Sequence, residues 1–378
     1  MRKIADTIAR LNAQKRHPAK GPQKAPKSTR LRPLPQFGSN PGALSGFYYI
    51  PDDLPENRPL VVVLHGCTQT ASGYDRHSGW SDLADEAGFA LLYPEQQRGN
   101  NPNLCFNWFV PSDTRRHLGE VHSIAQMIEA MIVAHRLDRT NVFVTGLSAG
   151  GAMAVSMLAT YPEVFAGGAV IAGLAHGMAN TIPEAFDRMR GHGIPSEQHL
   201  QRLLRAASDH EGQWPRLAIW QGDADQTVAP QNAQAIFAQW KGVQELHQTQ
   251  GTRKASDRLT REEWYNSAGQ AVLQVNIVAG MGHGTPISSH LGKPGPFMLN
   301  VGISSTREIA SFWGLSAEKG SEVSPAANIE RHAPATPPRI KAVQAKPEAA
   351  AHGETPRPAT SGIQKTIEDA LRAAGLMR

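Results

Sequence analysis

Apolar runs recur through the middle of the chain, and each ends in a polar or glycine-rich turn. Runs of this length with such ends are typical of buried strands. Five of them share the pattern: 58–64, 141–145, 168–172, 215–220 and 271–278. Residues 120–135 and the small-to-apolar segment 151–159 predict helices between the strands. Together these elements predict an α/β domain, in which a mostly parallel twisted sheet is flanked by helices.

Composition divides the 378 residues into one body and two arms. The ordinary apolar content is enough for one large core, which we place in a single domain over 37–314. Within it, the polar and helical segment 178–214 predicts a cap insertion. Beyond residue 314, Ala, Pro, Lys and Glu dominate and predict a linker over 315–360. Helical spacing of apolar residues then predicts a short amphipathic helix over 361–378.

Positive charge is concentrated at the amino terminus. The chain has 38 Lys and Arg against 33 Asp and Glu, a net charge of +5. Residues 1–32 hold ten of the basic residues and one acidic residue, so the rest of the chain carries about −4. We therefore assign 1–36 to a basic flexible arm and expect no nucleic-acid partner for the body. Ile4, Ile8 and Leu11 share a helical face of this arm, which either contacts an anionic surface or serves as a solubilising tail.

The sequence carries no membrane-spanning signal. No apolar run approaches the length that crosses a bilayer, so we expect no transmembrane segment. Residues 1–6 lack the apolar stretch of a signal peptide. These observations predict a cytoplasmic protein.

A serine lies in a tight glycine-flanked turn where the run 141–145 ends. Residues 146–150 read G-L-S-A-G, which is the pattern of a nucleophile elbow between a strand and a helix. Small flanking residues are needed because the serine has a strained backbone, and larger side chains would collide with the adjoining strand and helix. Ser148 is therefore the candidate nucleophile. The alternative is an ordinary Gly-Ser turn.

An elbow of this kind requires an acid and then a histidine later in the chain, each on a loop after a strand. Asp223 and Asp225 follow the run 215–220, and His283 follows the run 271–278 between two glycines. We assign Asp225 as the acid because Asp-x-x-Val after a Gly-x-x turn is typical of such a loop. Asp223 is expected to cap the turn by accepting backbone N–H groups. His283 is the candidate base, with His290 as the alternative.

The three residue types suit nucleophilic catalysis without a cofactor or a metal. A serine hydroxyl attacks a carbonyl at neutral pH only if a neutral imidazole takes its proton, and a carboxylate holds that imidazole in the right tautomer. Two backbone N–H groups should then stabilise the oxyanion, and we assign those of Cys67 and Ala149. His65, in the His-Gly turn after the run 58–64, either braces this loop or acts directly at the substrate.

Two further groups of residues are expected near the strand ends. The two cysteines, Cys67 and Cys105, lie on loops at the same end of the sheet. They form either a disulfide or two neighbouring reduced thiols, and a reducing cytosol favours the thiols. Asn107, Trp108 and Trp220 are candidates for an apolar substrate wall, although tryptophan is also common in cores.

Four segments together resemble one known family. They are 64–70 (LHGCTQT), 105–109 (CFNWF), 146–151 (GLSAGG) and 282–286 (GHGTP). They are similar to the polyhydroxybutyrate depolymerase family of serine esterases, whose relatives include feruloyl and acetylxylan esterases. The resemblance covers about residues 37–313. It implies the α/β-hydrolase fold.

The resemblance also implies triad roles for Ser148, Asp225 and His283. One departure is visible before the acid loop, where many relatives carry His-Gly and this chain reads W-Q-G at 220–222. This difference leaves the triad intact and bears on the local substrate contacts.

The leading interpretation is a carboxylic ester hydrolase that acts through an acyl-serine intermediate. The resemblance implies poly(3-hydroxybutyrate), another polyhydroxyalkanoate or their oligomers as the substrate. Feruloyl, acetyl-carbohydrate and other short-chain esters are the alternative substrates. A non-catalytic granule-surface or binding protein on the same fold is an alternative of another class, and its mark would be a broken triad. An extracellular location, as for many members of the resembled family, is the alternative to the cytoplasm.

Overall fold

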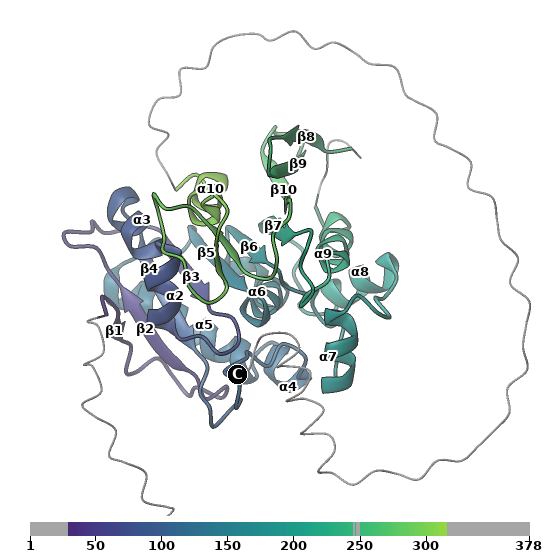
Figure 1. The fold of residues 1–378 in the computed structure, drawn as a ribbon. Helices are drawn as coiled ribbons and strands as arrows, with labels where there is room; N and C mark the ends of the chain where they lie inside the picture. The colour runs from purple at the N-terminus through teal and green to yellow at the C-terminus, as the bar shows by residue number, and fades with distance from the viewer. Residues whose placement is uncertain (1–28, 245, 247–249, 316–378) are drawn as a thin grey trace, which may run out of the picture.

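The structure of the protein, a computed structural model, describes residues 29–244, 246 and 250–315 (Figure 1). A ten-stranded sheet runs through this body in the order β1-β2-β4-β3-β5-β6-β7-β10-β9-β8. Its strands are β1 (Arg32–Pro33), β2 (Ser45–Tyr49), β3 (Leu60–Leu64), β4 (Ala90–Glu95), β5 (Val142–Leu147), β6 (Gly167–Ile171), β7 (Arg216–Gly222), β8 (Thr252–Ala255), β9 (Leu259–Tyr265) and β10 (Ala271–Val278).

The middle of the sheet is parallel and its two edges are antiparallel. Strands β4, β3, β5, β6, β7 and β10 pair in parallel. At the edges, β1 and β2 pair antiparallel on one side, and β9 and β8 on the other. All five residues of β3 are buried, as expected for a parallel strand with helices on both faces. The prediction of a mostly parallel sheet is confirmed.

Helices cover both faces of the sheet because successive strand residues point to opposite sides. One core cluster joins Leu60, Val62 and Leu64 of β3 to the helix over 182–189 and to four other helices. These are α5 (Gly119–His135), α6 (Ala149–Thr160), α8 (Glu197–Arg205) and α9 (Gln231–Lys241). The other cluster joins Val61 and Val63 to the opposite layer. That layer contains α2 (Ala71–Ser78), α3 (Trp80–Ala87) and α10 (Ser305–Phe312).

Shorter elements complete the described body. They are α4 (Pro111–Thr114), η1 (Pro162–Val164), α7 (Ile182–Met189) and a second, two-stranded sheet of β11 (Thr285–Ile287) and β12 (Met298–Asn300). None of the described helices combines the length and the apolar character that a bilayer-spanning helix needs.

The body begins earlier than the sequence predicts. Leu31 is only 5% exposed and lies in the core cluster, and Arg32 pairs with Tyr48 across the first two strands. Residues 29–36 therefore belong to the sheet edge rather than to the arm assigned to 1–36. The rest of that arm, the linker 315–360 apart from Leu315, and the predicted helix 361–378 lie outside the described residues.

The insertion over 178–214 forms α7 and α8. Ala185 of α7 and Leu200 and Leu204 of α8 are buried in the same cluster as Ile236 of α9. These helices thus extend the helical layer of that face. Their role as a cap over the site stays a prediction.

Candidate active site

Ser148 lies at the turn between β5 and α6, with φ 57° and ψ −119°. This left-handed backbone is rare for a residue with a side chain and stores strain. The N–H of Ser148 donates to the carbonyl oxygen of Ile171 at 2.9 Å, which fixes the turn against the end of β6. The sequence-predicted elbow is therefore present as a strand, a strained serine and a helix.

Both flanking glycines are required by close approaches of the backbone. A Cβ on Gly146 would lie 2.3 Å from the carbonyl oxygen of Gly150. A Cβ on Gly150 would lie 2.4 Å from the carbonyl oxygens of Leu64 and His65. Carbon cannot approach oxygen so closely, so glycine is the residue that fits at both positions. The same contact presses the elbow against the loop that follows β3.

Asp225 and His283 form a buried pair on two neighbouring loops. Asp225 Oδ2 lies 2.8 Å from His283 Nδ1, and their side chains are 0% and 6% exposed. The other carboxylate oxygen accepts the N–H groups of Thr227 at 2.8 Å and Val228 at 2.9 Å. Gln221 Nε2 donates to Oδ2 at 3.2 Å. A carboxylate held in this way keeps the proton on His283 Nδ1 and leaves Nε2 free to accept one.

The two alternatives considered for acid and base are located elsewhere. Asp223 is exposed, and its Oδ1 accepts the N–H of Gly280 at 2.6 Å. It therefore binds backbone N–H, as predicted for a cap, but the donor belongs to the histidine loop rather than to its own turn. His290 is exposed, and the imidazole that reaches Asp225 is that of His283.

The loop that carries His283 is held by a contact with α2 and by aromatic packing. The hydroxyl of Tyr74 lies 3.0 Å from that of Thr285, and the ring of Phe297 packs edge-on against His283 at 6.0 Å. Within the described residues, no hydrogen bond joins Ser148 Oγ to His283. In unliganded hydrolases this contact is often long and shortens when substrate binds.

The candidate oxyanion donors flank the contact between the elbow and the loop that follows β3. Among the residues that the structure describes, the N–H groups of Cys67 and Ala149 donate to no protein acceptor. Gln69 holds the Cys67 loop, because its Oε1 accepts the N–H of Gly66 at 2.9 Å and its Nε2 donates to Pro296 O at 3.2 Å. Two unpaired N–H groups beside the serine are what an oxyanion hole needs.

His65 is buried and braces the loop that follows β3. It is 1% exposed. Its Nδ1 donates to the carbonyl oxygen of Gly66 at 2.8 Å, and its Nε2 accepts the N–H of Gln96 at 3.1 Å. Burial lowers the pKa of His65 to about 4, so the ring is neutral at physiological pH. Of the two roles considered for His65, bracing fits the structure, because both ring nitrogens are already used inside the protein.

Cys67 and Cys105 are joined by a disulfide in the structure. The bridge ties the oxyanion loop to the segment that precedes Trp108. Of the two pairings left open by the sequence, the structure thus contains the bonded one.

The predicted aromatic wall is only partly available. Trp220 is fully buried in the core cluster of α2, α3 and α10, because its position along β7 directs the side chain into that layer. Its assignment as a substrate contact was therefore wrong. Asn107 and Trp108 are 8% and 6% exposed, so they retain only a small accessible surface, and their contact with substrate stays a prediction.

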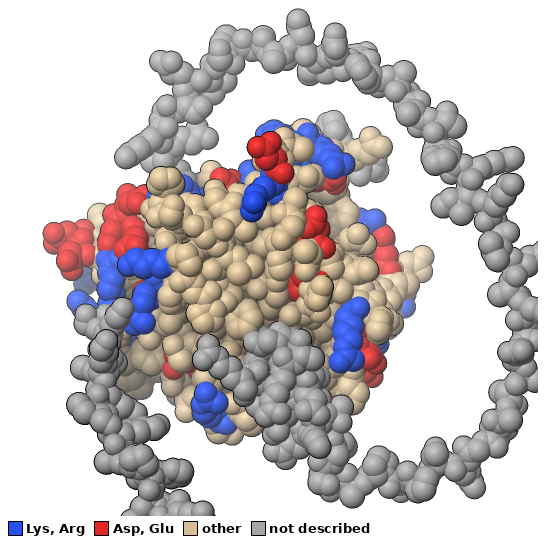
Figure 2. Space-filling view, viewed as in Figure 1, with Lys and Arg blue, Asp and Glu red and all other residues tan. Residues whose placement is uncertain are grey.

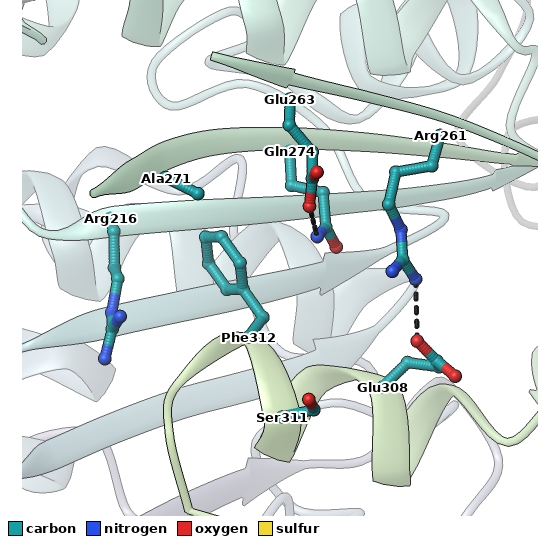
Figure 3. A pocket seen from close by; sticks show the side chains of 8 residues that line it. All are labelled: Arg216, Arg261, Glu263, Ala271, Gln274, Glu308, Ser311 and Phe312. Carbon is teal, nitrogen blue, oxygen red and sulfur yellow. Dashed lines mark hydrogen bonds and ion pairs between the residues drawn. The ribbon is translucent and has the colours of Figure 1, made fainter. Parts of the chain in front are cut away.

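A separate cavity of about 260 Å³ lies between the β9–β10 edge and α10 (Figure 3). It is lined at the start of β7 by Arg216, whereas the acid loop follows the other end of that strand. Its charged groups largely satisfy one another, since Arg261 pairs with Glu308 at 2.8 Å and Gln274 donates to Glu263 at 2.9 Å. This cavity therefore lies away from the proposed triad.

The face around the site has little charge at its centre. Figure 2 shows an uncharged area over the segment between β10 and α10, with acidic residues to its right and further Lys, Arg, Asp and Glu near the rim of this view. That segment, 279–304, contains His283 and a single charged residue, Lys293. In the part of the chain that the structure describes, no group of His, Cys, Asp and Glu could hold a metal ion.

Comparison with known proteins agrees with this geometry. Residues 44–265 match the family described as Esterase PHB depolymerase. The chain is 39% identical over 291 residues to poly(3-hydroxyalkanoate) depolymerase C of Paucimonas lemoignei, covering 75% of this chain and 70% of that one. The chain belongs to the PHB depolymerase esterase family.

Other relatives of this esterase carry a different name. It is 32% identical over 272 residues to a probable acetylxylan esterase A of Aspergillus clavatus, covering 70% of this chain and 86% of the relative. The solved acetyl xylan esterase of Aspergillus awamori matches with a TM-score of 0.66 at 26% identity, covering 76% and 99%. This PHB depolymerase family member is therefore a serine ester hydrolase with the α/β-hydrolase fold.

Two residues around this esterase site were missed from the sequence. Gln221 supports Asp225, and the departure from His-Gly at this point was a signal that could have drawn attention to it. Glu120 supports the loops beside Cys67 and Trp108. A carboxylate at the first turn of an apolar helix looks like an ordinary helix-dipole partner, so nothing in the sequence distinguished it.

Proposed function

We propose that this esterase hydrolyses the ester bonds of poly(3-hydroxyalkanoates) or of their oligomers, with Ser148 as the nucleophile. The observation that carries the chemistry is the 2.8 Å pair between Asp225 and His283, on loops that follow β7 and β10 beside the strained serine. The likeness to a relative named poly(3-hydroxyalkanoate) depolymerase C supports the substrate class.

The reaction proceeds in two halves. His283 Nε2 takes the proton of Ser148 as the serine oxygen attacks the ester carbonyl, and the N–H groups of Cys67 and Ala149 stabilise the oxyanion. The carbon–oxygen bond to the alcohol then breaks, and His283 gives its proton to the leaving alkoxide. A water molecule, deprotonated by His283, then attacks the acyl-serine, the bond from the acyl carbon to Ser148 Oγ breaks, and His283 returns its proton to Ser148 as the carboxylic acid leaves. Asp225 stabilises the imidazolium in both halves.

The uncharged centre of the face around the site favours a neutral ester. The segment 279–304 carries only Lys293 as a charged residue, so a neutral aliphatic polyester meets no large desolvation penalty there. We also propose that the terminal arms contact a granule surface. Those arms lie outside the described residues.

Acetylated carbohydrates are the second candidate substrates. This candidate is supported by the likeness to the acetyl xylan esterase of Aspergillus awamori, of which 99% is covered by the structural match. Feruloyl and short-chain esters belong to the same comparison.

Specificity constants on a panel of substrates separate these candidates. The panel contains amorphous polyhydroxybutyrate, soluble hydroxybutyrate oligomers, acetylated xylan, a feruloyl ester and p-nitrophenyl butyrate. The proposal predicts the highest kcat/KM for the hydroxybutyrate oligomers and release of soluble acid from the polymer. A preference for acetylated xylan over the oligomers would replace it by the second candidate.

We also propose that the protein works in an oxidising compartment, against the cytoplasmic location expected from the sequence. The Cys67–Cys105 disulfide supports this location, because such bonds are rarely kept in a reducing cytosol. Thiol alkylation of the protein in its native cells tests it, and two alkylated cysteines would restore the cytoplasmic alternative.

A further inference from the structure

Glu120 is a carboxylate buried at the start of α5. It is 0% exposed. Within the described residues it has no Lys, Arg or His partner at ion-pair distance. Burying an unpaired carboxylate is costly unless hydrogen-bond donors surround it.

Three N–H donors converge on this carboxyl group. Its Oε1 accepts Gln96 Nε2 at 2.6 Å and Asn100 Nδ2 at 3.2 Å, and its Oε2 accepts the backbone N–H of Asn107 at 2.9 Å. The neighbouring charged group is Asp113 of α4. Burial, and then the charge of Asp113, raise the pKa of Glu120 to about 8. Above about pH 8 the group is therefore a carboxylate, and both of its oxygens accept from these donors.

Oε1 of Glu120 is connected to the oxyanion loop through Gln96 and His65. Gln96, which donates to Oε1 through its side chain, donates its backbone N–H to His65 Nε2 at 3.1 Å. His65 in turn binds the carbonyl oxygen of Gly66, the residue before Cys67. The position of the proposed oxyanion donor thus depends on a chain of hydrogen bonds that starts at Glu120.

The other oxygen leads to the segment beside the disulfide. Oε2 holds the N–H of Asn107, immediately before Trp108. Gln96 Nε2 also donates to the carbonyl oxygen of Cys105 at 2.9 Å, and Cys105 is bonded to Cys67. Both sets of hydrogen bonds therefore reach the loop that carries Cys67, one through His65 and the other through the disulfide.

We propose that Glu120 is a positioning residue for ester hydrolysis, whose two carboxylate oxygens fix the Asn107–Trp108 segment and the Cys67 oxyanion loop relative to each other. The proposal rests on the function proposed above. Because an oxyanion donor acts mainly in the transition state, its displacement lowers kcat more than it raises KM.

Glu120→Gln tests this role at constant side-chain size. An amide has one acceptor and one donor end, so one set of the three N–H donors would face an N–H group instead of an oxygen. At pH 9, where Glu120 is ionised, we expect kcat for p-nitrophenyl butyrate to fall about 10- to 100-fold, as for a misplaced catalytic group, with KM changing less than about threefold. Hydrogen exchange of the 103–109 segment should become faster.

Glu263→Gln is the matched control. Glu263 is also a largely buried carboxylate, 8% exposed. It accepts Gln274 Nε2 and Tyr265 OH at 2.9 Å and, unlike Glu120, also pairs with Lys254 at 3.4 Å. It lines the separate cavity beside α10 (Figure 3). Its variant should keep kcat, KM and the exchange of 103–109 close to wild type.

A second variant covers the case in which Glu120→Gln does not fold. Gln96→Met removes one side-chain donor and keeps the backbone N–H that reaches His65, so it should lower kcat in the same direction by a smaller factor. The proposal is overturned if folded Glu120→Gln keeps kcat within about twofold, if exchange of 103–109 is unchanged, or if Glu263→Gln loses as much. The exchange measurement does not depend on turnover, whereas a fully active Ser148→Ala would contradict the proposed function itself.

Discussion

Asp225 and Glu120 are two buried carboxylates with opposite surroundings. Asp225 accepts two backbone N–H groups and an amide, and its remaining contact is the imidazole of His283. Glu120 accepts three N–H donors that cannot exchange a proton at neutral pH. Similar burial therefore gives two different roles. A carboxylate next to a base can stabilise the charge that the base gains, whereas a carboxylate among amides can only hold them in place.

The difference is also one of position in the fold. Asp225 follows β7, at the edge where Ser148 and His283 also lie, and it acts on the reacting groups through one histidine. Glu120 lies behind the oxyanion loop at the start of α5 and acts through at least two intervening residues. A substitution should therefore lower kcat less at Glu120 than at Asp225.

Removing the acid should have the largest effect. Asp225→Asn leaves the geometry nearly intact but favours the wrong tautomer of His283, so kcat should fall on the order of 10⁴-fold. Asp223→Asn, in the same loop but exposed, should cost less than about tenfold. Steady-state kinetics with p-nitrophenyl butyrate measure both. The comparison would be wrong if Glu120→Gln lowered kcat more than Asp225→Asn did, or if Asp223→Asn lowered it more than Asp225→Asn.

The disulfide is a covalent link parallel to the Glu120 network. Its two cysteines are 38 residues apart, and closing a loop of this length contributes about 4 kcal/mol in the chain-entropy account. Cys67→Ser combined with Cys105→Ser should therefore lower the free energy of unfolding by about that amount. Urea denaturation measures the loss. An unchanged denaturation midpoint would show that the amide contacts of Glu120 alone hold this loop.

How much of this could be predicted from the sequence differs between the two carboxylates. Asp225 and His283 were predictable because a strained serine between glycines fixes the chain order of its partners and places each after a strand. Trp220 was misassigned because strand alternation sends its side chain to one face or the other, and an apolar sequence does not say which face is accessible. Glu120 was invisible because its donors come from residues 96, 100 and 107, which only the folded chain brings together.

Glu120 should also make stability depend on pH. Its pKa is raised from 4.5 to about 8 in the folded protein, so the native state binds the proton more tightly than the unfolded state. This contribution to stability is complete below about pH 4.5 and is lost as pH rises through about 8. Glu120→Gln should flatten that part of the profile. Urea midpoints from pH 5 to pH 9 test it, and a parallel decline in wild type and variant would assign the decline to another group.

Truncation outside the described body should have the smallest effect. The Ser148, Asp225 and Glu120 sites all lie within 29–315, so a protein limited to those residues should keep kcat/KM for p-nitrophenyl butyrate within about twofold. Rates on amorphous polymer granules at low and high salt form the control. Selective loss on granules would support a surface role of the arms, and equal loss on both substrates would show that an arm supports the body.

Trapping the acyl-enzyme tests the central claim most directly. The protein is mixed with p-nitrophenyl butyrate, quenched in acid during the first turnover, digested and analysed by mass spectrometry. The account predicts one butyryl group on the peptide that contains Ser148, and none in Ser148→Ala. A butyryl group on another residue, or continued hydrolysis by Ser148→Ala, would contradict it.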